Sequence, residues 1–280
     1  MVARFCPMPL FRDVSADRGV VSGRGGLALA LGAGVLVVCG VGLRVGGMVD
    51  RVFWADEAES SINALTILRT GLPLGTHLGE PVYENTLTEP WPAHPEYAYR
   101  DSSYAPETNL AVYHGWLPLY AIAGAQALAG IAPDRSRSSW RPAHDAADIV
   151  RRTVAPRLPG VVFSLGAGFV VWRLLREVAG TPAAIVSLGW FCVGGKLVWF
   201  GHQARYYGAT LFFSALTVHA LYRVWRTGSR GAYVWFGVCG ALLFHTHALS
   251  ALVLAVAALT LAPWLVRREG WLPRGAACVA

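Results

Sequence analysis

Long apolar runs separated by polar and basic segments form the main pattern of this sequence. The first run covers residues 27–49, where Arg44 is the single charged residue. A helix rises about 1.5 Å per residue, so a run of this length crosses the roughly 30 Å hydrocarbon core of a bilayer. We therefore predict a first transmembrane helix at 27–49 and a cytoplasmic N-terminal segment at 1–26, which contains several arginines.

The second half of the chain contains further runs of this kind. We predict helices at 158–172, 181–200, 206–222, 232–244 and 248–266. The last two belong to one uninterrupted run, which as a single helix would be about 52 Å long, nearly twice the hydrocarbon thickness. The run should therefore fold back at His245-Thr246-His247. We expect residues 267–280 to form a cytoplasmic end at which the protein is truncated.

Residues 50–157 differ from the rest of the chain because they combine an acidic stretch at 50–109, rich in proline and tyrosine, with a basic stretch at 135–157. We predict an external loop there, with one apolar, uncharged run at 110–132. If this run crossed the bilayer, the later arginine-bearing loops would lie outside, against the rule that places positive loops in the cytoplasm. We therefore favour a helix at 110–132 that lies along the membrane surface. Its length and its lack of charge favour the crossing alternative.

The composition narrows the class of protein. Hydrophobic residues make up 54% of the chain and charged residues 15%, whereas soluble domains carry about 25% charged residues. The net charge of +7 comes from 24 basic residues, of which only Lys196 is not an arginine, and most lie at the ends of apolar runs. That distribution indicates membrane topology rather than a nucleic-acid partner. We predict an all-α, multi-pass protein of the plasma (inner) membrane, in contact with membrane lipids.

The sequence gives little sign of a metal or a disulfide framework. The five cysteines show no CxxC or CxxH spacing. His245 and His247 are two residues apart and would not lie on one face of a helix, which disfavours chelation. The sequence therefore requires no cofactor, and it leaves a divalent metal open but unsupported.

Three polar groupings fall on the predicted external side. Asp56-Glu57 follows the first span, residues 202–207 link two apolar helices, and His245-Thr246-His247 forms the break. A carboxylate beside the bilayer can act as a general base, although loop carboxylates are usually only solvated charges. Arg205 can bind a phosphate through charge-assisted hydrogen bonds, or it can extend to the interface beside an aromatic belt. Lys196 can likewise bind a phosphate or extend to the membrane interface.

Several short motifs follow one another along the chain. They are WADEA at 54–58, ILRTGLP at 67–73, YHGWLPLY at 113–120, RLPG at 157–160, HQARYY at 202–207 and HTH at 245–247. Their order resembles that of the membrane glycosyltransferases of the C superfamily (GT-C). The branch is that of the protein O-mannosyltransferases, the lipid A aminoarabinose transferase and the rhizobial lipopolysaccharide glycosyltransferases. The resemblance covers roughly residues 27–266 and depends on the order of the motifs rather than on any one of them.

The resemblance implies a GT-C-type helix bundle that moves a sugar, with inversion, from a polyprenyl-phosphate donor to an envelope glycan, lipid or protein acceptor at the external face. Asp56 matches the catalytic base of the family and Glu57 matches its neighbour. The residues expected to bind the donor and its phosphate are Arg205, Tyr207, His202, Lys196 and Arg157. The residues expected to line the site or bind the acceptor are His114, Tyr120, His245 and His247.

Two positions depart from the pattern of the family. Gln203 stands where the family commonly has a glutamate, which puts any role of that acid in base assistance or metal binding in doubt. Gly160 replaces a serine, which we interpret as a mild change. The family also continues through further spans, so we expect residues 1–280 to be a fragment or a reduced member.

A second class of function also fits the sequence. A non-catalytic membrane module could bind or translocate lipid-linked sugars, or the chain could be an inactive fragment. Gln203 and the short C-terminal end favour this reading. A secondary transporter would need paired repeats with broken helices, and we find no convincing internal repeat.

Overall fold

The computed structural model describes residues 24–49, 51–82, 105, 107–112, 115–133 and 145–266. Within this part of the chain, helices dominate, and the strands are limited to a short antiparallel hairpin of β1 (Thr76–His77) and β2 (Glu80–Pro81). The helices are α1 (Arg24–Gly46), α2 (Ala55–Thr70), α3 (Leu117–Leu128), α4 (Ala146–Val193), α5 (Gly195–Gly201), α6 (Tyr207–Thr227), α7 (Arg230–Phe244) and α8 (Ala248–Val266). The described chain is therefore an all-α protein, as predicted.

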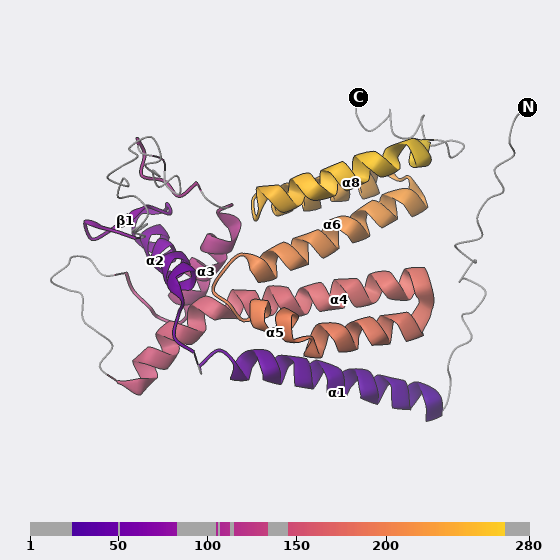
Figure 1. The fold of residues 1–280 in the computed structure, drawn as a ribbon, viewed down its shortest axis with the longest axis horizontal. Helices are drawn as coiled ribbons and strands as arrows, with labels where there is room; N and C mark the ends of the chain where they lie inside the picture. The colour runs from indigo at the N-terminus through magenta and orange to yellow at the C-terminus, as the bar shows by residue number, and fades with distance from the viewer. Residues whose placement is uncertain are drawn as a thin grey trace, which may run out of the picture.

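The long helix α4 consists of two segments that run in opposite directions. Gly180 interrupts it with φ 84° and ψ 180°, a conformation that only glycine adopts without strain. Figure 1 shows the chain reversing at this point and running back beside the first segment. The two segments and α5 include the helices predicted at 158–172 and 181–200.

The first segment of α4 begins at Ala146, twelve residues before the predicted start at 158. Asp145 explains this early start, because its carboxylate accepts a hydrogen bond from the backbone N–H of Asp148 at 2.6 Å and so caps the helix. Asp148 in turn accepts hydrogen bonds from Arg151 and Arg152 in the next turn, and these hydrogen bonds lower the pKa of its carboxyl. The predicted external loop is therefore shorter than 50–157.

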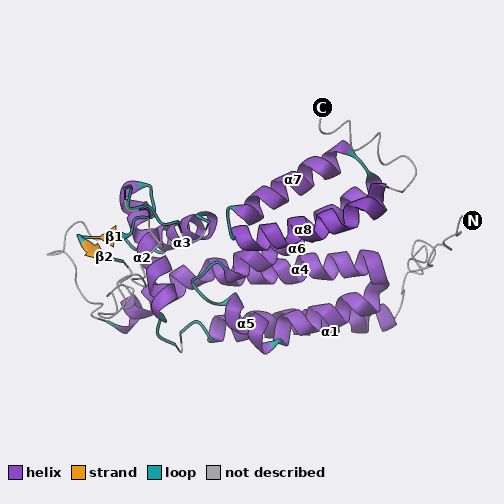
Figure 2. Cartoon of the chain, turned by 45° about the horizontal axis from the view of Figure 1, so that its top comes forward, coloured by secondary structure: helices purple, strands orange, loops and turns teal. Residues whose placement is uncertain are grey.

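The helices form a bundle with a smaller layer at one end (Figures 1 and 2). Within the bundle, α4 packs against α1 and α6, α6 packs against α7, and α8 packs against α6 and α7. The smaller layer contains α2 and α3, which pack against each other, and α3 also contacts α4. The turn at Gly180 and the link between α6 and α7 lie at the opposite end of the bundle, together with the start of α1.

Among the residues that the structure describes, two helices are long and apolar enough to cross a membrane, namely α1 from Leu27 to Gly46 and α4. Helices α3 and α7, and the part of α8 from Ala248 to Thr260, are apolar but shorter. The predicted helix at 110–132 is longer than the helix in the structure, because α3 has only 12 residues and is preceded by a β-bridge between Leu74 and Leu110. Twelve helical residues extend about 18 Å, which is less than the hydrocarbon thickness. Its orientation relative to a bilayer stays a prediction.

Arg44 fixes the point where α4 ends and α5 begins. Its guanidinium is fully buried and donates to the carbonyl oxygens of Phe191 at 2.8 Å and Cys192 at 3.2 Å. These are among the last carbonyls of α4, which have no partner within the helix and favour a positive charge. Arg44 also donates to Ser164 Oγ at 3.0 Å, so one side chain of α1 joins both segments of α4.

Candidate functional site

The first turn of α2 carries the acidic pair predicted to be catalytic. Asp56 and Glu57 follow the N-cap residue Trp54 by two and three positions, where a negative charge is favourable to the helix dipole. The helix ends at Gly71, which adopts a left-handed conformation with φ 83° and donates its N–H to Ile67 O at 2.7 Å. Both residues belong to the N-terminal turn of α2, and α2 lies beside one end of the bundle (Figure 1).

Glu57 forms a buried ion pair with Arg157 of α4. The Glu57 oxygens accept from Arg157 Nη2 at 2.7 Å and from Nε at 2.9 Å, and both side chains are 2% exposed. Glu57 also accepts from the backbone N–H of Ala204 at 2.8 Å. The carboxylate therefore binds α2 both to α4 and to the link between α5 and α6.

The remaining donors of Arg157 are used by the segment between α1 and α2. Its Nη1 donates to the carbonyl oxygens of Met48 and Arg51, the latter at 2.9 Å, and its guanidinium lies 4.8 Å from the centre of the Phe53 ring. Arg157 was predicted to bind the donor phosphate. Its burial and its full set of partners instead make it a structural residue in this arrangement.

Arg205 lies beside Asp56 and joins the acidic face of α2 to the start of α6. Its Nη2 is 3.2 Å from Asp56 Oδ2, and its Nη1 is 3.0 Å from Glu59 Oε2 and 3.1 Å from Ser60 Oγ. The Arg205 side chain is 8% exposed, whereas that of Asp56 is 28% exposed. Asp56 is thus a carboxylate that is held by a buried cation and can still be reached from outside.

Glu59 and Ser60 were not predicted as site residues. They follow Asp56 by three and four positions, so in a helix they lie on the same face as Asp56. That spacing became informative only once the structure showed that α2 begins at Ala55 and includes all three residues. The structure uses it to hold Arg205 between two carboxylates and a hydroxyl.

An aromatic stack extends the cluster to the break between α7 and α8. The Tyr206 ring lies parallel to the His247 ring, with centroids 4.8 Å apart and an interplanar angle of 6°. The Arg205 guanidinium is 5.6 Å from the centre of the Tyr206 ring. Burial raises the pKa of Tyr206 and lowers that of His247, and in both cases it favours the neutral form of the ring. His247 therefore belongs to the same cluster as Asp56.

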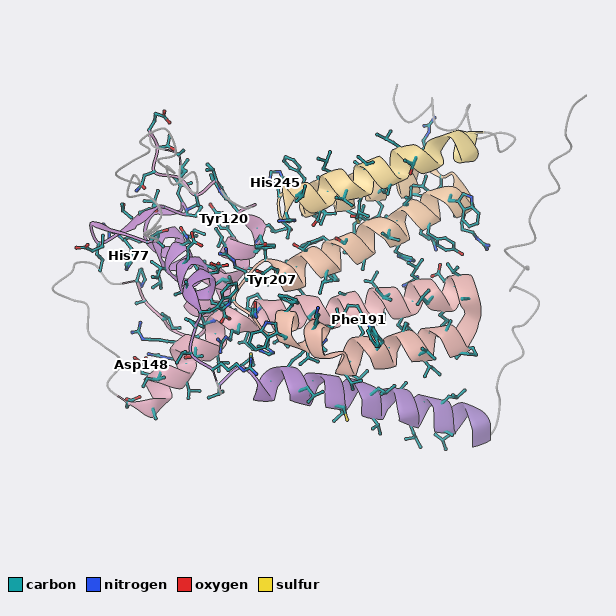
Figure 3. The ribbon with its side chains drawn as sticks, in the orientation of Figure 1. His77, Tyr120, Asp148, Phe191, Tyr207 and His245 are labelled. Atoms are coloured by element: carbon teal, nitrogen blue, oxygen red, sulfur yellow. The ribbon has the colours of Figure 1, made fainter. Side chains whose placement is uncertain are left out.

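His202 and Tyr207 belong to the same link, where His202 is buried and Tyr207 is half-buried. His202 is 6% exposed and lies edge-on to Trp199 at 5.7 Å. Burial, with a smaller effect from Arg157, lowers the pKa of His202. Tyr207 packs edge-on to Phe200 at 4.8 Å. Figure 3 places Tyr207 between the bundle and the α2–α3 layer.

The other predicted residues lie outside the Asp56 contacts. Lys196 is exposed on α5, and the side chain of His245 is exposed at the end of α7 (Figure 3). Tyr120 of α3 donates its hydroxyl to Gly71 O at 2.6 Å and so stabilises the end of α2. His114 lies outside the described residues. Of the predicted set, Asp56, Glu57, Arg157, His202, Arg205, Tyr207 and His247 come together.

Glycines at two close contacts hold these segments together. A Cβ on Gly115 would lie 1.8 Å from the carbonyl oxygen of His245, so the loop before α3 passes directly over the α7–α8 break. A Cβ on Gly160 would lie 2.5 Å from the carbonyl oxygen of Gln203. The glycine at 160 is therefore required by the packing in this chain, and our interpretation of it as a mild change was wrong.

The described residues contain no group of three or more His, Cys, Asp or Glu side chains arranged to hold a metal ion. Gln203, in the position of the glutamate of the family, is 3% exposed, and its Oε1 is buried without a hydrogen-bond partner among the described residues. The charged side chains at the centre of the cluster are the partly exposed carboxylate of Asp56 and the buried guanidinium of Arg205.

Comparison with known proteins adds no identification to this geometry. The chain matches no model of a known protein family, no curated protein and no solved structure.

Proposed function

We propose that the protein is a multi-pass membrane glycosyltransferase that transfers a sugar from a polyprenyl-phosphate donor to an acceptor hydroxyl or amine at the external face. The observation that carries the proposal is the partly exposed Asp56 carboxylate, 3.2 Å from the Arg205 guanidinium, at one end of an apolar helix bundle. A positioned carboxylate can accept a proton, and a buried cation can stabilise a departing phosphate.

In the proposed reaction, Asp56 removes the proton of the acceptor as the acceptor oxygen or nitrogen attacks the anomeric carbon. The bond between that carbon and the phosphate oxygen breaks, and its electron pair leaves with the polyprenyl phosphate. Attack opposite the leaving group inverts the configuration at the anomeric carbon. A phosphate is stable as an anion, so its departure requires no acid.

The ion pair between Asp56 and Arg205 suggests how the two halves of the reaction are coupled. In the resting site, the charge of Arg205 is shared between Asp56 and Glu59. When Asp56 accepts the acceptor proton, it becomes neutral and its attraction for the guanidinium decreases. Positive charge on Arg205 then becomes available at the time when negative charge develops on the phosphate.

The distribution of arginines supports an external position for the site. Arg173 and Arg176 precede the turn at Gly180, and Arg223, Arg226 and Arg230 flank the link between α6 and α7. Both connections lie at the end of the bundle opposite α2 (Figure 1). Positive segments tend to remain on the cytoplasmic side, and this tendency supports our proposal that the Asp56 end is external.

The test is a transfer assay with purified protein, radiolabelled polyprenyl-phosphate sugars and candidate envelope acceptors. We expect Asp56→Asn to lose transfer by at least about 100-fold, the lower range for a removed general base. Glu177→Gln is a matched control because Glu177 is 31% exposed and also lies 3.2 Å from an arginine, Arg173, at the other end of the bundle. Equal activity of Asp56→Asn and the wild type would contradict the proposal.

The second candidate is a non-catalytic module that binds lipid-linked sugars. The observation that favours it is Gln203, which is neutral and buried where the resembled family commonly has an acid. This candidate predicts that the wild type binds a polyprenyl-phosphate sugar and releases no transferred label with any acceptor. The same assay, run with an added binding measurement, separates the two functions.

A further inference from the structure

A pocket of about 240 Å³ lies beside α2, on the face of the helix that is turned away from Asp56. Its α2 wall is made of residues that recur every three or four positions and therefore share one face of the helix. They are Ala58, Ser61, Ile62 and Leu65. An α-helix turns by about 100° per residue, so Asp56 lies on the opposite face. The pocket is thus separate from the proposed catalytic cluster.

Two buried polar atoms at this pocket are unused by the described part of the chain, namely Ser61 Oγ and Gln126 Oε1. Ser61 is 6% exposed and Gln126 is 3% exposed. The Gln126 amide has a fixed orientation, because its Nε2 donates to the Ser61 carbonyl oxygen at 3.1 Å and the reversed amide would bring two oxygens together. Buried polar groups nearly always have a partner, so the pocket calls for a ligand group that donates a hydrogen bond.

Arg152 of α4 adds positive charge to the pocket. Its Nε lies 2.9 Å from Asp148 Oδ2, and the same carboxylate also pairs with Arg151. One carboxylate and two guanidinium groups leave a single net positive charge at this edge of the pocket. The side chain of Arg152 is 40% exposed, so an anion can approach it. The charge therefore favours an anionic ligand.

Most of the remaining surface of the pocket is apolar. It comes from Phe53 before α2, from Ile62 and Leu65 of α2, and from Ile131 after α3. A hydrocarbon chain covers such walls well, because it needs no hydrogen-bond partners. A matching ligand therefore combines a hydrogen-bond donor, a negative charge and a short length of hydrocarbon chain.

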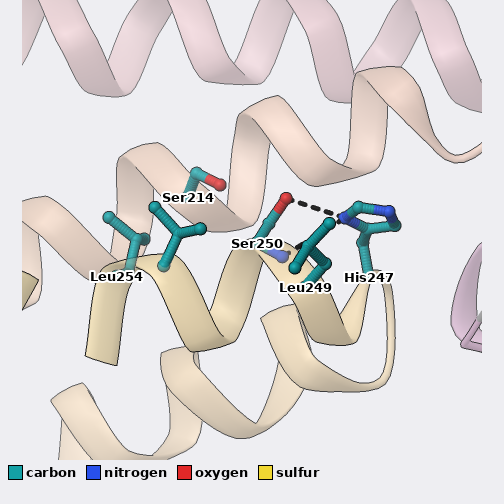
Figure 4. Close-up of a pocket in the computed structure, with 6 residues that line it drawn as sticks. Ser214, His247, Leu249, Ser250 and Leu254 are labelled. Carbon is teal, nitrogen blue, oxygen red and sulfur yellow. Dashed lines mark hydrogen bonds between the residues drawn. The ribbon is translucent and has the colours of Figure 1, made fainter. Parts of the chain in front are cut away.

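The groove between α6 and α8 provides a comparison, because it lacks two of these features (Figure 4). It has a volume of about 300 Å³, and the described residues that line it include no arginine, lysine or carboxylate. Its His247 Nδ1 and Ser250 Oγ lie 2.8 Å apart and satisfy each other. The pocket beside α2 therefore shows a ligand requirement that this groove does not show.

We propose that the pocket beside α2 binds the phosphoglycerol head group of an anionic phospholipid, phosphatidylglycerol. The phosphodiester lies at Arg152, and a glycerol hydroxyl donates to Gln126 Oε1 beside Ser61 Oγ. The first carbons of an acyl chain follow Phe53 and Leu65. The bound lipid joins α2, α3 and α4, the three helices that surround the pocket. The inference goes beyond sugar transfer and needs only that the α2–α3 layer lies at the membrane surface, as the sequence predicts for α3.

A first test compares phosphatidylglycerol with three compounds that each lack one of its features. Phosphatidylethanol has the same charge but no head-group hydroxyl, phosphatidylethanolamine has a hydrogen-bond donor but no net charge, and glycerol 3-phosphate has no acyl chain. Each is titrated into the purified full chain in detergent, and binding is followed by native mass spectrometry and by the unfolding temperature. We expect phosphatidylglycerol to bind at least about tenfold more tightly than each of the others, the loss that one missing contact produces. Any of the three that binds as tightly as phosphatidylglycerol would overturn the proposal, and for glycerol 3-phosphate this result would indicate a soluble phosphoester as the ligand.

A second test removes the hydrogen-bond acceptor from the pocket. Gln126→Leu deletes the amide at nearly constant size and should weaken phosphatidylglycerol binding about tenfold, while phosphatidylethanol binding stays within about twofold of the wild type. Because both lipids are measured on the same variant, a general loss of stability does not produce this difference. A pocket that holds only water would show equal changes for the two lipids, which would overturn the proposal.

A third test removes the charge. Arg152→Gln should weaken both lipids about tenfold, because both carry the phosphodiester. Arg173→Gln is the matched control, since Arg173 also pairs with a carboxylate four residues away, Glu177, but lies at the other end of the bundle. The control should stay within about twofold of the wild type. Equal losses in the two variants would overturn the proposal.

None of these measurements uses sugar transfer, so they separate the pocket from the proposed function. If phosphatidylglycerol binding depends on Gln126 and Arg152 while no acceptor is glycosylated, the pocket assignment stands and the glycosyltransferase proposal fails. If transfer depends on Asp56 but the preference for phosphatidylglycerol is absent, the glycosyltransferase proposal stands and the pocket assignment fails.

Discussion

Two acid–arginine pairs share the first turn of α2, and they differ in burial and in geometry. Glu57 and Arg157 are both 2% exposed and are joined by two hydrogen bonds. Asp56 is 28% exposed, its Oδ2 lies 3.2 Å from Arg205 Nη2, and its backbone carbonyl accepts a hydrogen bond from Arg205 Nη1 at 3.1 Å. Adjacent residues of one helix thus hold one closed pair and one accessible pair.

The difference separates a structural role from a chemical one. A buried carboxylate with all its oxygens occupied cannot approach a substrate, but it can fix the relative positions of α2, α4 and the link before α6. A carboxylate that is held from one side and open on the other can accept a proton from a bound molecule. We therefore propose a positioning role for Glu57 and a chemical role for Asp56.

The largest expected effect on stability comes from breaking the closed pair. Arg157→Met leaves the Glu57 carboxylate buried and without its cation, which should lower the free energy of unfolding by about 3–5 kcal/mol. The measurement is thermal or denaturant unfolding in detergent. Arg173→Met, which removes an exposed ion pair with Glu177, should cost less than about 1 kcal/mol. Similar losses in the two variants would contradict the structural role of Arg157.

An intermediate effect is expected at the contact between the α3 loop and the α7–α8 break. Gly115→Ala would place a methyl group against the carbonyl of His245, and the backbone would have to move at a cost of about 1–3 kcal/mol. Gly124→Ala in α3 is the control, because a Cβ there contacts nothing within 4 Å and should be neutral or stabilising by up to about 1 kcal/mol. Unfolding midpoints compare the two, and a tolerated Gly115→Ala would contradict the close contact.

The smallest expected effect is the contribution of His202 to the pH dependence of the free energy of unfolding. Burial lowers the pKa of His202 in the folded protein, so the unfolded chain binds more protons below the ordinary histidine pKa of about 6.5. The stabilising contribution of His202 to the free energy of unfolding is complete above that pH. It decreases as the pH falls through the pKa that His202 has in the folded protein. His202→Asn should flatten the dependence of the unfolding midpoint on pH below 6.5. If this slope were unchanged in His202→Asn, groups other than His202 would cause the pH dependence.

The sequence was a good guide to features that depend on local pattern. The length of the run at 232–266 predicted a break, and the structure has that break at His245-Thr246-His247, between α7 and α8. The end of α2 at Gly71 follows from the GLP signal at 71–73. The early start of α4 had a local signal as well, because Asp145 is a good helix N-cap residue.

Contacts between distant segments could not be predicted in the same way. Glu57 and Arg157 are 100 residues apart, and nothing local shows that Arg157 binds Glu57 while Arg205 binds Asp56. The need for glycine at positions 115 and 160 depends on carbonyl groups from other helices. Such contacts are set by the packing of whole elements, which the periodicity of a single segment does not encode.

The most direct test of the central claim is to measure sugar transfer and unfolding temperature together for Asp56→Asn and Glu57→Gln. Both variants remove one negative charge from the same turn of α2. The account predicts that Asp56→Asn abolishes transfer while its unfolding temperature stays near that of the wild type, and that Glu57→Gln lowers the unfolding temperature markedly. An Asp56→Asn protein that still transfers sugar, or that loses activity only because it unfolds, would contradict the account.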